Sequence, residues 1–200
     1  MIPKMPSRRL NIDKITNALG NDANNIKIIK NFMPKEHINM FLNYIKLQAK
    51  FRDAIEEDKF LNECYYEREY IRVYEHLMRA ELMKMYNINF ERDRTVDLNN
   101  RKEGSSLPTH TDFIQSQFID PIEPPPVYPT NSWSGHFSCL IYLNDNFDGG
   151  EIYFPKQDVT VKPEAGMLIA FPGNKNYEHS VNPFYGSERF ALSLWTRVKL

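Results

Sequence analysis

Three residues of the sequence have the types and the spacing to hold one metal ion. His110 and Asp112 are two positions apart, and His179 follows much later in the chain. In an extended strand, side chains two positions apart project from the same face, so the His110 imidazole and the Asp112 carboxylate can reach a single ion. Two imidazoles and one carboxylate leave about three positions open on an octahedral ion, which suits non-haem Fe(II) and its oxygen chemistry. We therefore predict a ferrous iron site at these three residues.

A structural zinc site is a weaker interpretation, because such sites usually close their shell with four ligands rich in cysteine. The chain has only Cys64 and Cys139, and neither belongs to a CxxC pair. His136 is the next candidate ligand, but it directly precedes a predicted strand, and we expect it to be a loop residue or to lie beside the ligands. A zinc-containing binding module that uses the same three residues stays open as an alternative.

An arginine close to the third predicted ligand could bind a carboxylate. Arg189 follows His179 by ten residues, and a guanidinium can hold a carboxylate through two parallel charge-assisted hydrogen bonds, which lysine cannot reproduce. The segment between them, NPFYGS at 182–187, is rich in turn formers, so we expect the flanking runs to pair as a hairpin that returns Arg189 to the metal. Strand alternation places on one face Arg189, Ala191, Ser193 and Trp195.

Four ordered stretches carry a resemblance to a known family. They are HTD at 110–112, FSCLIYLNDNFDGGEIYFP at 137–155, VKPEAGMLIAFP at 161–172 and GSERFALSLW at 186–195. Together they resemble the signature of the 2-oxoglutarate and Fe(II)-dependent oxygenases, and within that superfamily the prolyl hydroxylase group. The similarity is clearest from about residue 95 to residue 200, and a weaker similarity is found at 25–37.

The resemblance implies an enzyme that uses Fe(II), 2-oxoglutarate and O2, with ascorbate as a candidate reductant for oxidised iron. By this match the catalytic residues are His110, Asp112, His179 and Arg189. Arg189 would bind the distal carboxylate of 2-oxoglutarate, and Tyr142 and Ser193 would each offer a hydroxyl to the same group. The cosubstrate would lose CO2 to give succinate while an unactivated C–H bond is hydroxylated, with a prolyl residue of a protein or peptide as the expected substrate.

The resemblance leaves the substrate open, since fold and metal site do not fix it. Relatives often carry a tyrosine some ten residues before the first histidine, whereas Asn100 stands near that register here. Free proline or another small amino acid is the first alternative substrate, and a different protein side chain is the second. A catalytically silent jelly-roll protein that binds a metabolite or a partner is an alternative of another class. A nucleobase demethylase is disfavoured, because the second arginine of that relative's C-terminal motif is not found.

The elements that must position these residues fall into two halves. Apolar residues three or four positions apart predict amphipathic helices at about 34–57 and 67–86, and the apolar face of the second is expected to hold Ile71, Tyr74, Leu77, Met78, Leu82 and Met85. Runs of strand formers follow at 137–143, 151–154, 167–171 and 190–198, and the glycines at 149, 150 and 166 fit turns that need positive φ. We predict a mainly β fold with N-terminal α-helices, a double-stranded β-helix (a jelly-roll or cupin-like barrel) supported by two helices.

We expect one Fe(II)/2-oxoglutarate dioxygenase domain at 25–200, with its catalytic barrel core at about 95–200 and an N-terminal extension at 1–24. The stretch 113–135 contains five prolines, and a loop of this length is usually functional or disordered. Because it begins next to Asp112, we expect it to pass over the metal, where Phe118, Tyr128 and Trp133 could contact substrate. A loop folded back on the barrel is the alternative.

Composition argues against several classes of partner. The chain has 25 basic and 26 acidic residues, and its net charge of -1 gives no electrostatic reason to expect nucleic acid. No run approaches the roughly 18 apolar residues of a membrane span, and the first residues lack the apolar region of a secretory signal. Two cysteines without evident pairing indicate a reducing cytoplasm. Frequent Asn, Ile and Lys are typical of an AT-rich genome such as that of a phage or another virus, and the oligomeric state is not predicted.

Overall fold

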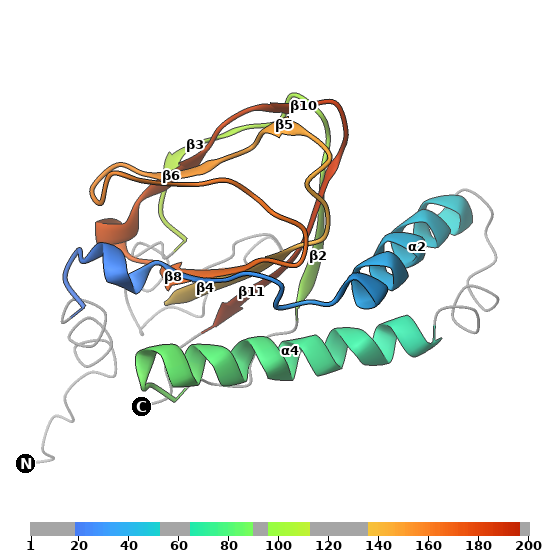
Figure 1. Ribbon diagram of the computed structural model, residues 1–200, viewed down its shortest axis with the longest axis horizontal. Coiled ribbons are helices and arrows are strands. Elements are labelled where there is room, and N and C mark those ends of the chain that lie inside the picture. Colours follow the sequence, from blue (N-terminus) through green and yellow to red (C-terminus); the bar gives the residue numbers. More distant parts are fainter. Residues whose placement is uncertain (1–18, 53–64, 90–95, 113–135, 197–200) are drawn as a thin grey trace, which may run out of the picture.

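The strands form two antiparallel sheets that face each other, and two helices cover the outside of one of them (Figure 1). The computed structural model describes residues 19–52, 65–89, 96–112 and 136–196. The larger sheet has five strands in the order β1 (Lys27–Ile29), β8 (Leu168–Pro172), β4 (Phe137–Tyr142), β11 (Arg189–Thr196) and β2 (Asp97–Arg101). The smaller sheet has four strands in the order β3 (Leu107–His110), β9 (His179–Val181), β6 (Ile152–Phe154) and β7 (Val159–Val161). A separate ribbon pairs β5 (Asp148–Gly149) with β10 (Phe184–Tyr185).

The central strands of the larger sheet are buried on both faces, because one face packs on the helices and the other faces the second sheet. On β8, Leu168 and Ala170 belong to the core against the helices, whereas Ile169 and Phe171 belong to the core between the sheets. This alternation is the two-residue period of an extended strand. It explains why the sequence of β8 is apolar at consecutive positions.

Both predicted helices form. The first, α2 (Lys35–Arg52), follows Pro34, and the second, α4 (Tyr65–Tyr86), crosses the outer face of β4, β8 and β11 (Figure 1). The buried stripe of α4 recurs every four residues and consists of Tyr74, Met78, Leu82 and Tyr86. The prediction that Leu77 shares this face is wrong, because the four-residue stripe turns position 77 away from the sheet and leaves its side chain 45% exposed. Residues 53–57 of the first predicted helix lie outside the described part of the chain, and no described helix is apolar enough over a sufficient length to cross a membrane.

The predicted hairpin around 182–187 does not form. β9 pairs with β3 and β6, whereas β11 pairs with β4 and β2 in the other sheet. The connecting segment directs its backbone hydrogen bonds to the turn at 150–151 instead: Asn182 N donates to Glu151 O at 2.9 Å, and Gly150 N donates to Pro183 O at 3.2 Å. The turn-rich segment therefore carries the chain from one sheet to the other.

Within the described residues, no ladder of hydrogen bonds closes the two sheets into one barrel. The predicted jelly roll is an open sandwich of two packed sheets. The predicted turn glycines do have positive φ, at +86° for Gly149, +73° for Gly150 and +79° for Gly166.

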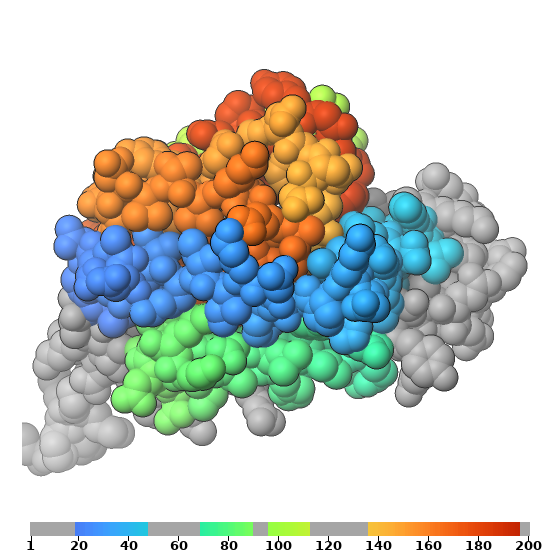
Figure 2. All heavy atoms as spheres, in the orientation of Figure 1, coloured from blue at the N-terminus to red at the C-terminus, as the bar shows by residue number. Residues whose placement is uncertain are grey.

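The part of the predicted N-terminal extension that the structure describes packs on the sandwich. The short 3-10 helices at Ala23–Asn25 and Lys175–Tyr177 meet through the Tyr177 hydroxyl, which donates to Asp22 O at 3.1 Å and accepts from Asn25 Nδ2 at 2.9 Å. Figure 2 shows the N-terminal segment and α2 in blue, lying between the orange strands and α4. The boundary of the extension at residue 24 stays a prediction.

Candidate functional site

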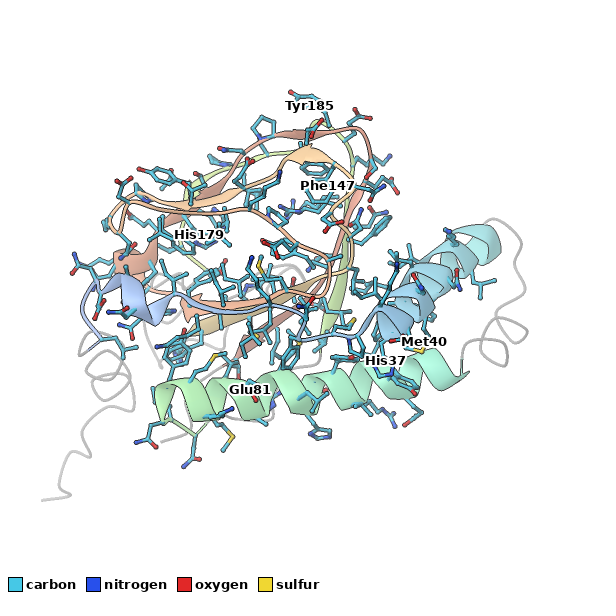
Figure 3. The ribbon with its side chains drawn as sticks, viewed as in Figure 1. His37, Met40, Glu81, Phe147, His179 and Tyr185 are labelled. Atoms are coloured by element: carbon cyan, nitrogen blue, oxygen red, sulfur yellow. The ribbon has the colours of Figure 1, made fainter. Side chains whose placement is uncertain are left out.

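The three predicted metal ligands converge on the smaller sheet. β3 and β9 are neighbours, and His110 is paired with His179 across them, with ring centroids 4.4 Å apart. His110 Nε2 lies 3.7 Å from Asp112 Oδ1, and His179 Nε2 lies 3.9 Å from Asp112 Oδ2. One ligand atom from each residue lies within 4.8 Å of the others, so an ion with ligand distances of about 2 Å can contact all three. Figure 3 shows His179 at one side of the space between the two sheets.

The backbone fixes the orientation of both imidazoles. His110 Nδ1 lies 2.8 Å from Pro108 O, and His179 Nδ1 lies 3.1 Å from Tyr177 O. A carbonyl oxygen only accepts, so Nδ1 carries the proton in each ring and Nε2 keeps its lone pair. Metal-ligating histidines commonly have this arrangement, with the second nitrogen held by a carbonyl or a carboxylate.

Aromatic walls keep His179 neutral. The rings of Phe171 and Phe154 lie 4.7 and 5.5 Å from its imidazole. Burial lowers the pKa of His179 below its ordinary value, and the attraction of Asp112 opposes this only in part. A neutral imidazole is the form that binds a metal.

Ser138 holds the carboxylate ligand from the opposite sheet. It lies on β4, is fully buried, and its hydroxyl donates to Asp112 Oδ2. A hydrogen bond to the anionic form of a carboxylate stabilises that form and restricts its rotation. Together, two imidazoles and one carboxylate on the same side of a cavity fit an iron(II) ion with open coordination positions.

Arg189 is the buried cation of the site. Arg189 is the first residue of β11 and is 7% exposed. Its side chain lies between the rings of Tyr142 and Phe184, and its guanidinium carbon is 5.9 and 5.4 Å from their centroids. The one hydrogen bond of the guanidinium to a described residue runs from Nη1 to Gly150 O, at 3.5 Å. Burial lowers its pKa, and Tyr142 acts in the opposite direction. A guanidinium nevertheless stays protonated in proteins, so Arg189 is available to an anion.

Two hydroxyl-bearing residues, Tyr142 and Ser193, line the same cavity as the guanidinium. Tyr142 is 1% exposed, and burial raises the pKa of its phenol, so the group stays protonated and can donate. Ser193 Oγ accepts a hydrogen bond from Asn99 Nδ2 at 2.7 Å, which leaves the serine proton free to donate elsewhere. A carboxylate beside Arg189 can therefore find further donors.

The triad and Arg189 open into one cavity of about 310 Å³ between the sheets. Its lining comes from both sheets and consists of Asn99, Arg101, Leu107, His110, Asp112, Leu140, Tyr142, Ile152, Phe171, His179, Val181, Arg189, Ala191, Ser193 and Trp195. The face of β11 predicted to turn inward therefore does so. Arg189 lines the same cavity as the three candidate ligands, and the chain reaches this arrangement by a crossover between sheets and not by the predicted hairpin.

Sequence reasoning missed Asn99, Arg101 and Ser138. The predicted register pointed to Asn100, but this residue is exposed and does not line the cavity, whereas both of its neighbours do. Once Leu98 is known to pack on the outer core, strand alternation places Asn99 and Arg101, one and three positions later, on the inner face. Nothing in the sequence marks Ser138 as a partner of Asp112.

Two further histidines do not belong to the ligand group. His136 is buried just before β4, its backbone paired with Thr196 and Gly173, and it does not belong to the ligand group. His37 Nδ1 lies 2.7 Å from the Tyr74 hydroxyl, between α2 and α4 (Figure 3). The proline-rich stretch 113–135, including Phe118, Tyr128 and Trp133, lies outside the described residues.

Comparison with known proteins agrees with this site. A family model described as the 2OG-Fe(II) oxygenase superfamily matches residues 96–197, just over half of the chain. Human prolyl 3-hydroxylase 3 is 31% identical over 130 residues, which cover 60% of this chain and 16% of that protein. Mouse prolyl 3-hydroxylase 2 is 30% identical over 102 residues, which cover 48% of this chain and 14% of that protein. The chain spans about a seventh of the length of these curated relatives.

Solved structures share the fold. A prolyl-4-hydroxylase from Pseudomonas putida has a TM-score of 0.59 and 19% identity, with 94% of this chain and 95% of that chain covered. A prolyl hydroxylase from Trichoplax adhaerens, in complex with a hypoxia inducible factor oxygen degradation domain peptide fragment, has a TM-score of 0.55 and 16% identity, with 96% and 94% covered. At these identities the likeness shows the architecture, in which two helices support an antiparallel sandwich.

Proposed function

Because the chain belongs to the 2OG-Fe(II) oxygenase superfamily, we propose that it hydroxylates a prolyl residue of a protein or peptide. The superfamily uses Fe(II), 2-oxoglutarate and O2. The observation that carries the proposal is the convergence of His110, Asp112 and His179 in one cavity with a buried Arg189, which has no ion pair among the described residues. The prolyl substrate is supported by the names of the relatives and of the structural neighbours.

The residues of the triad would hold the iron through His110 Nε2, His179 Nε2 and the Asp112 carboxylate. Bound iron supplies the oxidation, in which one atom of O2 enters a C–H bond of the substrate and the other enters succinate as 2-oxoglutarate loses CO2. The protein contributes position and a shielded cavity. Phe171 and Phe154 exclude water from one side of His179, and Ser138 holds the orientation of the Asp112 carboxylate.

Arg189 would bind the carboxylate of 2-oxoglutarate that lies farther from the metal. Its burial makes the ion pair stronger than one in water, because the surrounding dielectric is lower. Tyr142 and Ser193 can add neutral hydrogen bonds to the same carboxylate, the first from a phenol that stays protonated and the second from a hydroxyl oriented by Asn99. Three donors on one carboxylate set both the position and the direction of the cosubstrate.

Turnover with matched substrates tests the proposal. Fe(II)-loaded protein is incubated with 2-oxoglutarate, O2 and ascorbate, together with either a proline-rich peptide or free proline, and succinate is measured beside the substrate mass. We expect succinate formation coupled to the gain of one oxygen atom on a peptide proline. A gain on free proline alone would replace the peptide by a small amino acid as the substrate. Absence of succinate with every substrate would favour a catalytically silent binding protein.

The need for ascorbate and a cytoplasmic location are also proposals. A requirement for ascorbate over many turnovers, and not in the first one, is the result expected if it only restores oxidised iron. The location rests on the sparse cysteines and stays a prediction.

A further inference from the structure

A second arginine stands next to Arg189 and has no part in the proposed binding of iron or cosubstrate. Arg101 ends β2, and the antiparallel register pairs it directly with Arg189 on β11. It lies on the same face of β2 as Asn99, and both line the cavity that contains the metal ligands. Like charges placed directly opposite each other in a sheet are destabilising, so this pairing carries a cost that an anion in the cavity would remove.

The described residues offer Arg101 no counter-ion. Its side chain has no hydrogen bond or ion pair with any described residue, and the nearby acid Glu103 accepts instead from Gly186 N at 2.9 Å. Arg101 is also exposed, whereas Arg189 is 7% exposed. The two cations therefore occupy different depths, with Arg189 buried inside the cavity and Arg101 at its exposed mouth.

The charges of the proposed complex balance without Arg101. The two carboxylates of 2-oxoglutarate and the Asp112 carboxylate together match a divalent iron ion and the Arg189 guanidinium. His110 and His179 bind metal as neutral imidazoles and add nothing. The charge of Arg101 remains, and an uncompensated cation at the edge of a cavity attracts an anionic group.

We propose that Arg101 is a specificity-determining residue that binds a carboxylate of the substrate. The proposal rests on the function proposed above and narrows its substrate class to molecules with a carboxylate close to the carbon that is hydroxylated. Two sources have this chemistry: the side chain of an acidic residue next to a peptide proline, and the α-carboxylate of free proline or of a C-terminal proline. A guanidinium can bind either carboxylate through two parallel, charge-assisted hydrogen bonds (a bidentate contact).

Equilibrium binding separates this role from catalysis. Protein loaded with Mn(II) and 2-oxoglutarate without O2 is titrated calorimetrically with two pairs of probes. The first pair is a blocked peptide with proline between two glutamates and the same peptide with glutamines. The second pair is free proline and prolinamide. We expect wild type to prefer the carboxylate member of one pair by about 10-fold or more, since a hydrogen bond to a charged group is worth about 1.5–3 kcal/mol. The pair that shows the preference identifies the source of the carboxylate.

Variants then assign the preference to Arg101. Arg101→Gln is expected to reduce it to less than about 3-fold, and Arg101→Lys to keep an intermediate part of it. Lys102→Gln removes the same charge from the next residue, which does not line the cavity, and should leave the preference intact. The proposal is overturned if wild type shows no preference in either pair, or if Arg101→Gln retains it. It is also overturned if Arg101→Gln weakens 2-oxoglutarate binding as much as loss of Arg189 does, because Arg101 would then belong to the cosubstrate site. Because binding is measured without turnover, failure of the hydroxylation assay does not decide this test.

Discussion

The hydroxyl of Ser138 donates a hydrogen bond to Oδ2 of Asp112, and the two residues come from opposite sheets of the sandwich. Asp112 follows β3, whereas Ser138 lies on β4 in the middle of the five-stranded sheet. One contact therefore links the geometry of the metal ligands to the packing of the sheet that also carries Arg189. Packing changes in the larger sheet should for this reason affect the metal site.

Ser138→Ala should weaken metal binding without unfolding the protein. Loss of a group that orients a ligand typically lowers metal affinity by about 10–100-fold. The measurement is the dissociation constant for Fe(II) under anaerobic conditions, by calorimetry, with far-ultraviolet circular dichroism to verify the fold. Ser180→Ala is the matched control, because Ser180 lies between His179 and Val181 on β9 and alternation turns it to the other face. An unchanged dissociation constant in Ser138→Ala would show that Asp112 needs no partner.

Arg189→Gln should weaken cosubstrate binding while leaving metal affinity unchanged. The variant removes the buried charge and the bidentate contact with the cosubstrate carboxylate. We expect the affinity for 2-oxoglutarate to fall by about 10–100-fold. Anaerobic titration of the Fe(II) protein, followed by the weak visible charge-transfer band of the iron and 2-oxoglutarate complex, measures the affinity. Arg72→Gln on the exposed face of α4 is the control. Equal affinities in wild type and Arg189→Gln would remove Arg189 from the cosubstrate site.

Tyr142→Phe distinguishes a hydroxyl that binds the cosubstrate from a tyrosine that only fills the core. Burial keeps the phenol protonated, so it is a neutral donor over the whole working pH range. Loss of one neutral hydrogen bond should weaken 2-oxoglutarate binding by about 2–10-fold. The anaerobic titration of the Fe(II) protein with 2-oxoglutarate measures this affinity. If Tyr142 is only a packing residue, affinity stays constant, since phenylalanine keeps the ring.

The sequence was sufficient to predict which residues meet and insufficient to predict how the chain brings them there. The two-residue period placed His110 beside Asp112 and turned Arg189, Ser193 and Trp195 inward, because these are local properties of a strand. The pairing partners of β9 and β11 depend on which sheet buries each strand, which is a long-range property, and the predicted hairpin between them was therefore wrong. Turn formers at 182–187 indicate only that the chain changes direction.

The side-chain contacts between the two sheets could not be predicted from the sequence either. Ser138 and Asp112 are brought together by the packing of two sheets, and no spacing in the sequence encodes that distance. Asn99 and Arg101 fall on the inward face of β2, but a short polar strand does not reveal which of its faces is inward until its neighbour is known. The error at Leu77 has the same origin, because an apolar face on a helix specifies a stripe only to within about one residue.

Stability of the metal-free protein should fall in mild acid through His179. Burial lowers its folded-state pKa below the ordinary 6.5, so the unfolded chain binds more protons than the folded one as the pH falls below about 6.5. The stabilising contribution of the neutral imidazole is thus present above the unfolded pKa and is lost as the pH falls through the folded pKa. Urea unfolding of wild type and His179→Gln across this range gives the test. A slope that is the same in both proteins would assign the acid sensitivity to another group.

Gly166→Ala should destabilise the fold more than the same change at Gly104. Both glycines have a φ of +79°, so the cost of placing alanine in the left-handed region, about 1–2 kcal/mol, is common to the two variants. They differ in space: a Cβ at Gly166 would lie 2.5 Å from Met33 O and 3.2 Å from Ile38 Cδ1, whereas nothing lies within 4 Å of one at Gly104. Because neighbouring atoms must shift to relieve this overlap, Gly166→Ala should lower the free energy of unfolding by a further amount of about 1–3 kcal/mol, the usual penalty for overpacking.

The Gly166 turn also supports the cosubstrate pocket. Its N–H donates to Tyr142 O at 2.8 Å, and its carbonyl accepts from Met33 N at 3.0 Å, so it ties the start of α2 to the end of β4. We therefore expect Gly166→Ala to weaken 2-oxoglutarate binding as well as to lower the free energy of unfolding, whereas Gly104→Ala should change stability alone. Urea unfolding and the anaerobic titration of both variants supply the comparison. Equal destabilisation by the two substitutions would mean that the turn can shift away from Met33 at little cost, and the link between α2 and the pocket would then be a loose one.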